Sequence, residues 1–221
     1  MGSEPLSSKV KRFLLDQIVK GELVPGQRIV ESRLAKELDI SQSPVREALR
    51  DLVGLGLVEI ESRRGARVRQ PTAKELRDVS EVRAEIDALA ARLAASRLDE
   101  ARIEELKTCH RTMSECHERR DFIGMTEADA RFHQIIAEAS GNGAVRRVFG
   151  QLEPFARTFI TLTSPDVELE GILQQHEGIL EALVSGDGDL AACRAHDHQL
   201  SVRKAFFEGS DEDADTVLNA S

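Results

Sequence analysis

Two short amphipathic segments joined by a tight turn occupy residues 33–50 and constrain the fold more than any other feature of the chain. Apolar residues recur at helical spacing on both sides of a break at Ile40 and Ser41, with Leu34, Ala35 and Leu38 before it and Val45, Ala48, Leu49 and Leu52 after it. Ser41 or Ser43 can cap the second segment, and Pro44 is tolerated in the first turn of a helix. The pattern predicts a helix-turn-helix, which is typical of DNA-binding proteins.

Polar and basic side chains occupy the outer side of this predicted motif. Such side chains reach phosphates and base edges when a helix lies in the major groove of double-stranded DNA. The predicted DNA contacts are Arg33, Ser41, Gln42, Ser43, Arg46 and Arg50. The alternative is an ordinary helical hairpin with a solvated charged face.

The net charge of the whole chain, −9, argues at first against a nucleic-acid partner. Residues 1–70, however, carry 13 Lys and Arg against 10 Asp and Glu, whereas residues 71–221 carry 17 against 29. Because binding to phosphate depends on local cations, only the first segment is expected to approach DNA. The acidic remainder must have another role.

Residues 1–70 are expected to form one winged-helix domain. An amphipathic helix precedes the helix-turn-helix, and two short β-like runs at residues 57–60 and 66–68 follow it. The hairpin between these runs carries Arg63, Arg64 and Gly65 at its tip. We expect this basic wing to contact the DNA backbone or the minor groove beside the recognition helix.

Residues 71–208 are expected to form an all-α helical bundle, so the fold class is mainly α with an N-terminal winged helix-turn-helix. Thr72 and Glu75 match a capping box that begins a long helix, with an inward stripe at Val79, Val82, Ile86, Leu89 and Leu93. Pro154 is expected to interrupt a later helix. Residues 209–221 are acidic and polar and are predicted to be a disordered tail. No apolar run approaches the ~20 residues of a membrane span, and no signal peptide is visible, so a cytoplasmic location is expected.

One Asp and three His are predicted to face the interior of the bundle. Asp129 and His133 are four residues apart on one helix, while His176 and His198 lie in the apolar stripes of two others. A lone buried His is usually a hydrogen-bonded core residue. Four such groups from three helices also suit a divalent ion such as Zn²⁺, Ni²⁺ or Mn²⁺. The spacing alone leaves a metal site and a hydrogen-bonded core both open.

Two runs of sequence carry a family resemblance. The segments L-x-P-G-x-x-I at residues 23–29 and LAKELDISQSPVREALRDLVGLGLV at residues 34–58, with the basic wing, resemble the DNA-binding domain of the GntR family of bacterial regulators. Many members carry Arg where this chain has Gln42, a side chain that can pair with adenine. The run D-x-x-F-H-x-x-I from Asp129 and the segment HEGILEAL from His176 resemble the FadR-type ligand-binding domain of the FCD group.

The resemblance implies specific site residues. In the FCD group many members bind a metal through one Asp and three His, which by position are Asp129, His133, His176 and His198. His196 is an alternative to His198. The resemblance further implies that Arg83 grips a carboxylate of an effector, although an Arg paired on the surface with Asp87 explains the spacing equally. Asn142 is either an effector contact or a helix C-cap.

The expected function is therefore a DNA-binding transcriptional regulator, a repressor by resemblance. A homodimer would bind a two-fold operator, and a small carboxylate effector at the metal site would modulate binding. A metal-dependent enzyme acting on a small carboxylate, with the winged helix as an accessory domain, is the alternative. A third interpretation is a structural metal in an interaction module. The sequence identifies neither the effector nor the operator.

Overall fold

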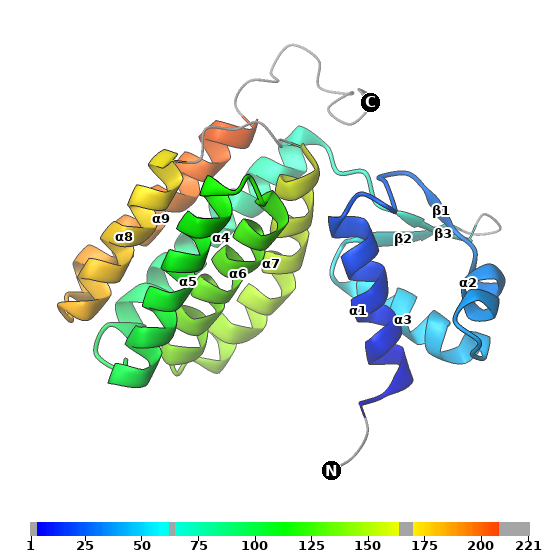
Figure 1. The fold of residues 1–221 in the computed structure, drawn as a ribbon, viewed down its shortest axis with the longest axis horizontal. Coiled ribbons are helices and arrows are strands. Elements are labelled where there is room, and N and C mark those ends of the chain that lie inside the picture. Colours follow the sequence, from blue (N-terminus) through cyan, green and yellow to red (C-terminus); the bar gives the residue numbers. More distant parts are fainter. Residues whose placement is uncertain (1–3, 62–64, 164–169, 208–221) are drawn as a thin grey trace. The chain divides into compact units, whose positions relative to one another are not determined.

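A computed structural model describes residues 4–61, 65–163 and 170–207 and divides the chain at the junction between Pro71 and Thr72 into two compact units (Figure 1). The first unit is a small mixed domain, and the second is built of helices. The predicted fold class, mainly α with a winged helix-turn-helix ahead of a helical bundle, is confirmed. The predicted tail, residues 209–221, lies outside the described residues.

The first unit contains the three predicted helices and a small sheet. The elements are α1 (Leu6–Val19), β1 (Arg28–Ile29), α2 (Glu31–Glu37), α3 (Gln42–Gly54), β2 (Val58–Glu61) and β3 (Gly65–Val68). The strands are antiparallel in the order β1-β3-β2. The sequence predicted β2 and β3 but not β1, because a strand of two residues has no periodicity to detect.

The helix-turn-helix is held by a core that α1, α3 and β2 share. Leu14 and Ile18 on α1 and Leu49 and Leu52 on α3 are fully buried, and α1 packs against α3. Gly56 has a φ of 73°, a left-handed conformation that suits glycine where the chain turns from α3 towards β2. This core fixes α3 by its apolar side and leaves the opposite side free for a ligand.

The second unit consists of helices throughout its described residues. They are α4 (Ala73–Ala94), α5 (Glu100–Glu118), α6 (Phe122–Ala139), α7 (Gly143–Thr163), α8 (Glu170–Val184) and α9 (Gly188–Phe207). Side chains cap the starts of several: Thr72 and Glu75 form the predicted capping box, and Asp99 and Asp187 accept backbone N–H groups of α5 and α9. None of the helices described is both long and apolar enough to cross a membrane.

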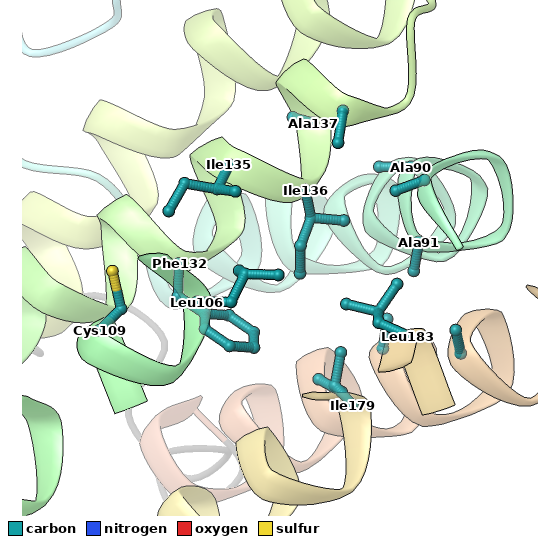
Figure 2. Close-up of a cluster of buried hydrophobic side chains, with 14 of the residues drawn as sticks. Ala90, Ala91, Leu106, Cys109, Phe132, Ile135, Ile136, Ala137, Ile179 and Leu183 are labelled. Atoms are coloured by element: carbon teal, nitrogen blue, oxygen red, sulfur yellow. The ribbon is translucent and has the colours of Figure 1, made fainter. Parts of the chain in front are cut away.

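The bundle encloses one apolar core to which all six of its described helices contribute. Figure 2 shows Leu106 of α5, Phe132 and Ile136 of α6, and Ile179 and Leu183 of α8 converging near the alanines of α4. Phe132, Leu106 and Ile179 are completely buried. This core brings side chains of α6 and α8 together: the ring centre of Phe132 lies 5.2 Å from that of His176, and Phe132 directly precedes His133 in the chain.

The inward side of α4 differs from the prediction. Two residues of its predicted stripe lie outward, with Val82 50% exposed and Leu89 38% exposed. Val79, Ile86 and Leu93 are half-buried, and Ile86 packs against the core. The inward side instead carries Ala84, Ala90, Ala91 and Ala94 together with the buried polar residues Ser80, Arg83 and Asp87.

Small residues explain this orientation of α4. They let α4 approach α9, which presents Ala191, Ala192 and Ala195 in its own buried positions. Gly188, the first residue of α9, lies so close that an added Cβ would be 2.8 Å from the carbonyl oxygen of Arg92. Hydrophobic periodicity favours the largest side chains, so it placed the stripe at the edge of the buried side of a helix whose contacts depend on small residues.

Pro154 does not interrupt its helix, contrary to the prediction. α7 runs continuously from Gly143 to Thr163 with the proline inside it. An internal proline costs about 3 kcal/mol of helix stability. Burial of Phe149 and Phe155 on either side of Pro154 provides a compensating gain, since each large aromatic contributes about 1.5–3 kcal/mol when buried.

Candidate metal centre and nucleic-acid interface

The structure brings Asp129, His133, His176 and His198 together inside the second unit. One ligand atom from each lies within 4.8 Å of every other, and the residues come from α6, α8 and α9. Oδ1 of Asp129 is 2.8 Å from Nε2 of His176 and 3.7 Å from Nε2 of His133. Metal bonds of about 2.0–2.2 Å place ligand atoms at most about 4.4 Å apart, so a small contraction would close the four groups on one ion.

Hydrogen bonds on the outer side of two imidazoles set which nitrogen faces the cluster. Nδ1 of His176 lies 2.9 Å from the carbonyl oxygen of Ile172, and Nδ1 of His198 lies 3.2 Å from Oε1 of Gln175. These oxygens accept, so both Nδ1 atoms carry a proton and both Nε2 atoms present a lone pair. This is the arrangement in which His residues ligate a metal through one nitrogen and anchor the ring through the other.

Two of the inward nitrogens have no hydrogen-bond partner among the described residues. They are Nε2 of His133 and Nε2 of His176, both in buried side chains. The carboxylate oxygen 2.8 Å from His176 Nε2 is a second acceptor, and two acceptors at that distance repel unless a cation joins them. Orphaned nitrogens facing a carboxylate fit a divalent ion, so the residues present suit the predicted group.

The pKa values in the cluster favour metal-binding protonation states. Burial is the main cause that lowers the pKa of His133 and of His198 below 6.5, with neighbouring imidazoles adding to the effect. For Asp129 burial acts in the raising direction, but the contact with His176 and the charges of the other imidazoles outweigh it, and its pKa lies well below the usual range. Neutral imidazoles and an ionised carboxylate are the forms that ligate metals.

Buried polar side chains of α4 and α9 form a hydrogen-bonded group beside this cluster. Arg83 and Asp87 are both about 4% exposed, and Nη2 of Arg83 donates to Oδ2 of Asp87 over 3.2 Å. Arg83 therefore pairs with Asp87, as one interpretation of the sequence held, but in the interior and not on the surface. Its guanidinium lies 5.6 Å from the ring centre of Phe149, and its Nε has no hydrogen-bond partner among the residues described.

The two remaining sequence candidates in this unit lie apart from the cluster. His196 is one third exposed, with Nε2 3.5 Å from Oε1 of Glu85, and is not part of the four-residue group. Oδ1 of Asn142 accepts the backbone N–H groups of Ala144 and Val145, so Asn142 caps the start of α7 and not the end of α6. An effector contact by Asn142 stays a prediction.

On the first unit, the predicted DNA-contacting residues lie on the outer side of α2 and α3. Arg33, Ser41, Gln42, Ser43, Arg46 and Arg50 are all exposed. Ser41 is the N-cap of α3, although its hydroxyl makes no capping hydrogen bond. Gly65 opens β3 with a φ of 84°. Arg63 and Arg64 lie outside the described residues.

Arg46 is held in place by two neighbours. Its Nε lies 2.6 Å from Oε2 of Glu31 on α2, and its Nη2 donates to Oε1 of Gln42 over 3.2 Å. The guanidinium is thus fixed across the turn that joins the two helices while more than half of the side chain remains exposed. Sequence reasoning missed Glu31, because nothing in the linear pattern relates it to a residue fifteen positions later.

Comparisons with known proteins agree on both units. The model for bacterial regulatory proteins of the gntR family matches residues 6–68, and the FCD domain model matches residues 78–201. A probable D-xylose utilization operon transcriptional repressor of Paenarthrobacter nicotinovorans is 31% identical over 98% of this chain and 95% of its own length. The HTH-type transcriptional repressor RspR of Escherichia coli is 27% identical over 95% of this chain and 94% of its own.

Solved structures support the same fold. McbR/YncC of Escherichia coli matches with a TM-score of 0.78 and 21% identity, covering 93% of this chain and 98% of that one. A putative GntR transcriptional regulator from Rhodococcus sp. RHA1 matches with a TM-score of 0.78 and 23% identity, covering 92% and 98%. At these identities the likeness concerns the fold alone.

Proposed function

The chain belongs to the gntR family of bacterial regulatory proteins and carries an FCD domain, and on that premise we propose that its helical unit senses a small carboxylate through a bound divalent metal ion. The chain is a DNA-binding transcriptional regulator, and several of the relatives it matches are named as repressors. The alternative of a metal-dependent enzyme has no support from those relatives. What the helical unit binds, and how, is our proposal.

Asp129, His133, His176 and His198 are the proposed ligands of the ion. The observation that carries this proposal is the convergence of four ligand atoms within 4.8 Å, two of them buried nitrogens without a hydrogen-bond partner among the described residues. Three imidazoles and one carboxylate suit Zn²⁺, Ni²⁺ or Mn²⁺. Four protein ligands leave coordination positions for a ligand oxygen on an ion that accepts more than four.

Arg83 is the proposed second anchor of the effector. Its Nη2 is engaged by Asp87, while its Nε remains without a partner among the described residues although it is buried. A carboxylate would satisfy that donor through a charge-assisted hydrogen bond. A small organic acid that reaches both the ion and Arg83 would therefore be favoured over a neutral sugar.

A homodimer is the proposed DNA-binding form, because two recognition helices then meet the two halves of a symmetric site. The outward stripe of α4, defined by Val79, Val82, Ile86, Leu89 and Leu93, supports the proposal. Within the described residues Val82 and Leu89 are exposed, while Val79, Ile86 and Leu93 are half-buried. A second copy of this chain, presenting the same stripe, is its proposed occupant.

The proposed DNA contacts of each protomer are the exposed residues of α2 and α3 together with the wing arginines Arg63 and Arg64. An effector can change operator affinity only if it binds one arrangement of the protein better than another. We propose that effector binding disfavours the DNA-binding arrangement, as in a repressor that its ligand releases.

One experiment tests the proposed sensing directly. Operator fragments are selected from genomic DNA with the full-length chain, and a panel of small carboxylic acids and their neutral analogues is titrated against the complex, with and without added Zn²⁺. We expect one or more acids to release the DNA only in the presence of metal. Release by neutral sugars in metal-free buffer would contradict both the metal and the carboxylate.

A further inference from the structure

A single carboxylate oxygen, Oδ2 of Asp87, contacts side chains of three helices inside the second unit. Nε2 of Gln199 on α9 donates to it over 2.7 Å, and Nη2 of Arg83 on α4 donates over 3.2 Å. Nδ1 of His133 on α6 lies 3.6 Å away. The side chain of Asp87 is only 3% exposed, so these neighbours and not water determine its energy.

Asp87 faces His133 from the side opposite to the proposed ion. For His176 and His198 the corresponding Nδ1 atoms are held by oxygens of Ile172 and Gln175. His133 has the carboxylate of Asp87 in that place, at a distance that is a charge contact and not yet a hydrogen bond. A carboxylate on Nδ1 favours a proton there and increases the electron density that Nε2 offers a metal.

The charge of Asp87 is compensated by Arg83 and not by solvent. A buried carboxylate without a cation is strongly unfavourable, and the guanidinium of Arg83 offsets that cost. Gln199 adds a hydrogen bond from α9, one residue after the proposed ligand His198. The same oxygen thus joins the helix of one proposed ligand, the ring of another and the proposed effector arginine.

We propose that Asp87 is a positioning residue for the metal: it holds His133 in the tautomer and orientation that ligate the ion. Arg83 compensates the charge of Asp87 in the metal-free chain, and the bound ion would take over part of that compensation. The inference rests on the metal site of the proposed function. It makes opposite predictions for the two halves of one ion pair. Removing Asp87 weakens metal binding, whereas removing the nearby cation Arg83 strengthens it.

The test measures Zn²⁺ affinity of metal-stripped full-length chain by competition with a chromophoric chelator. Asp87→Asn keeps the size of the side chain and an acceptor for Gln199 but removes the charge, and we expect affinity to fall by about 10- to 100-fold. Arg83→Met removes a positive charge beside the ion, and we expect tighter binding. Asp78→Asn is the matched control, since Asp78 lies exposed on the same helix and pairs with Lys74.

Loss of stability must be separated from loss of positioning. Breaking either half of a buried ion pair loosens the fold, so a merely structural role would weaken Zn²⁺ binding in both single variants. The double variant Arg83→Met with Asp87→Asn removes both charges together. We expect its thermal unfolding to lie nearer that of the wild-type chain than either single variant does, with Zn²⁺ affinity still reduced.

The outcomes of these experiments test the positioning role of Asp87 separately from the proposed metal site. If Asp87→Asn binds Zn²⁺ as tightly as the wild-type chain, or if Arg83→Met weakens binding to the same degree, the positioning role is wrong while the metal site stands. If the wild-type chain itself fails to bind Zn²⁺, the proposed metal site is wrong, and the inference about Asp87 is wrong with it.

Discussion

Oδ1 of Asp129 lies 2.8 Å from Nε2 of His176, a nitrogen that presents a lone pair because the proton of that ring is directed at Ile172. Two acceptors so close require a shared cation, which is either a proton or a metal ion. The stability of the bundle and its affinity for metal should therefore both depend on pH.

The first prediction concerns stability against pH in the metal-free protein. Burial lowers the pKa of His133 and His198, so protons bind these rings more weakly in the folded than in the unfolded chain. Their contribution to the free energy of unfolding is complete above about pH 6.5, the pKa of His in the unfolded chain. It is lost as the pH falls from there towards the lower pKa values of these rings in the folded chain. Urea unfolding of the chelator-treated chain should show this decline, and His198→Gln should flatten it. Parallel profiles for the two proteins would contradict the assignment of the decline to these rings.

The second prediction concerns the proposed ligands. His133→Ala should reduce the metal content of purified protein, measured by plasma emission, from about one equivalent per chain to a small fraction, because Asp and His ligands act together on one ion. Binding to operator DNA without effector should be spared, since the recognition helix belongs to the other unit. His196→Ala is the matched control and should retain the metal, because His196 faces Glu85. Equal metal content in the two variants would refute the assignment.

The third prediction concerns the recognition helix. Arg46→Ala should weaken operator binding by about 1–3 kcal/mol, and if the contact is to phosphate it should also reduce the slope of log affinity against log salt by about 1. Fluorescence anisotropy over a series of salt concentrations measures both quantities.

Arg111→Ala provides the control for that measurement, because Arg111 is similarly exposed but lies on α5 of the other unit, beside Glu104. Unchanged affinity in Arg46→Ala would mean that α3 is not the helix that reads DNA. A loss of the same size in Arg111→Ala would point to a general effect of charge.

The fourth prediction concerns the outward stripe of α4. Val82→Glu should shift the chain from dimer to monomer in light scattering and weaken operator binding, because a charge would be buried in an apolar contact. Val184→Glu is the matched control, since Val184 on α8 is equally exposed, at 50%. A Val82→Glu chain that remains dimeric would place the dimer contact elsewhere.

The sequence predicted the elements whose signals are local. The capping pair Thr72 and Glu75, the turn before α3 and the apolar faces of α1 and α3 are short-range patterns, and the structure contains each of them. The shared location of Asp129, His133, His176 and His198 was also predicted from position, because each lies at helical spacing in an apolar stripe of its helix.

Long-range contacts explain what the sequence did not predict. The inward side of α4 is set by close approach to α9, which alanines and Gly188 permit and which hydrophobicity does not mark. The sequence suggested a surface pair of Arg83 with Asp87, but the pair is buried. Asp87 also accepts a hydrogen bond from Gln199, which lies 112 positions later in the sequence. Continuation of α7 through Pro154 likewise depends on tertiary packing outweighing a local preference.

The central claim is that one divalent ion is held by Asp129, His133, His176 and His198, and anomalous diffraction from crystals of the metal-loaded chain tests it most directly. Data collected on both sides of the absorption edge of the added metal should give one strong peak per chain, with bonds of about 2.0–2.2 Å to Oδ1 of Asp129 and to Nε2 of the three imidazoles. A peak at His196 or at another surface group, with none among these four residues, would contradict the account.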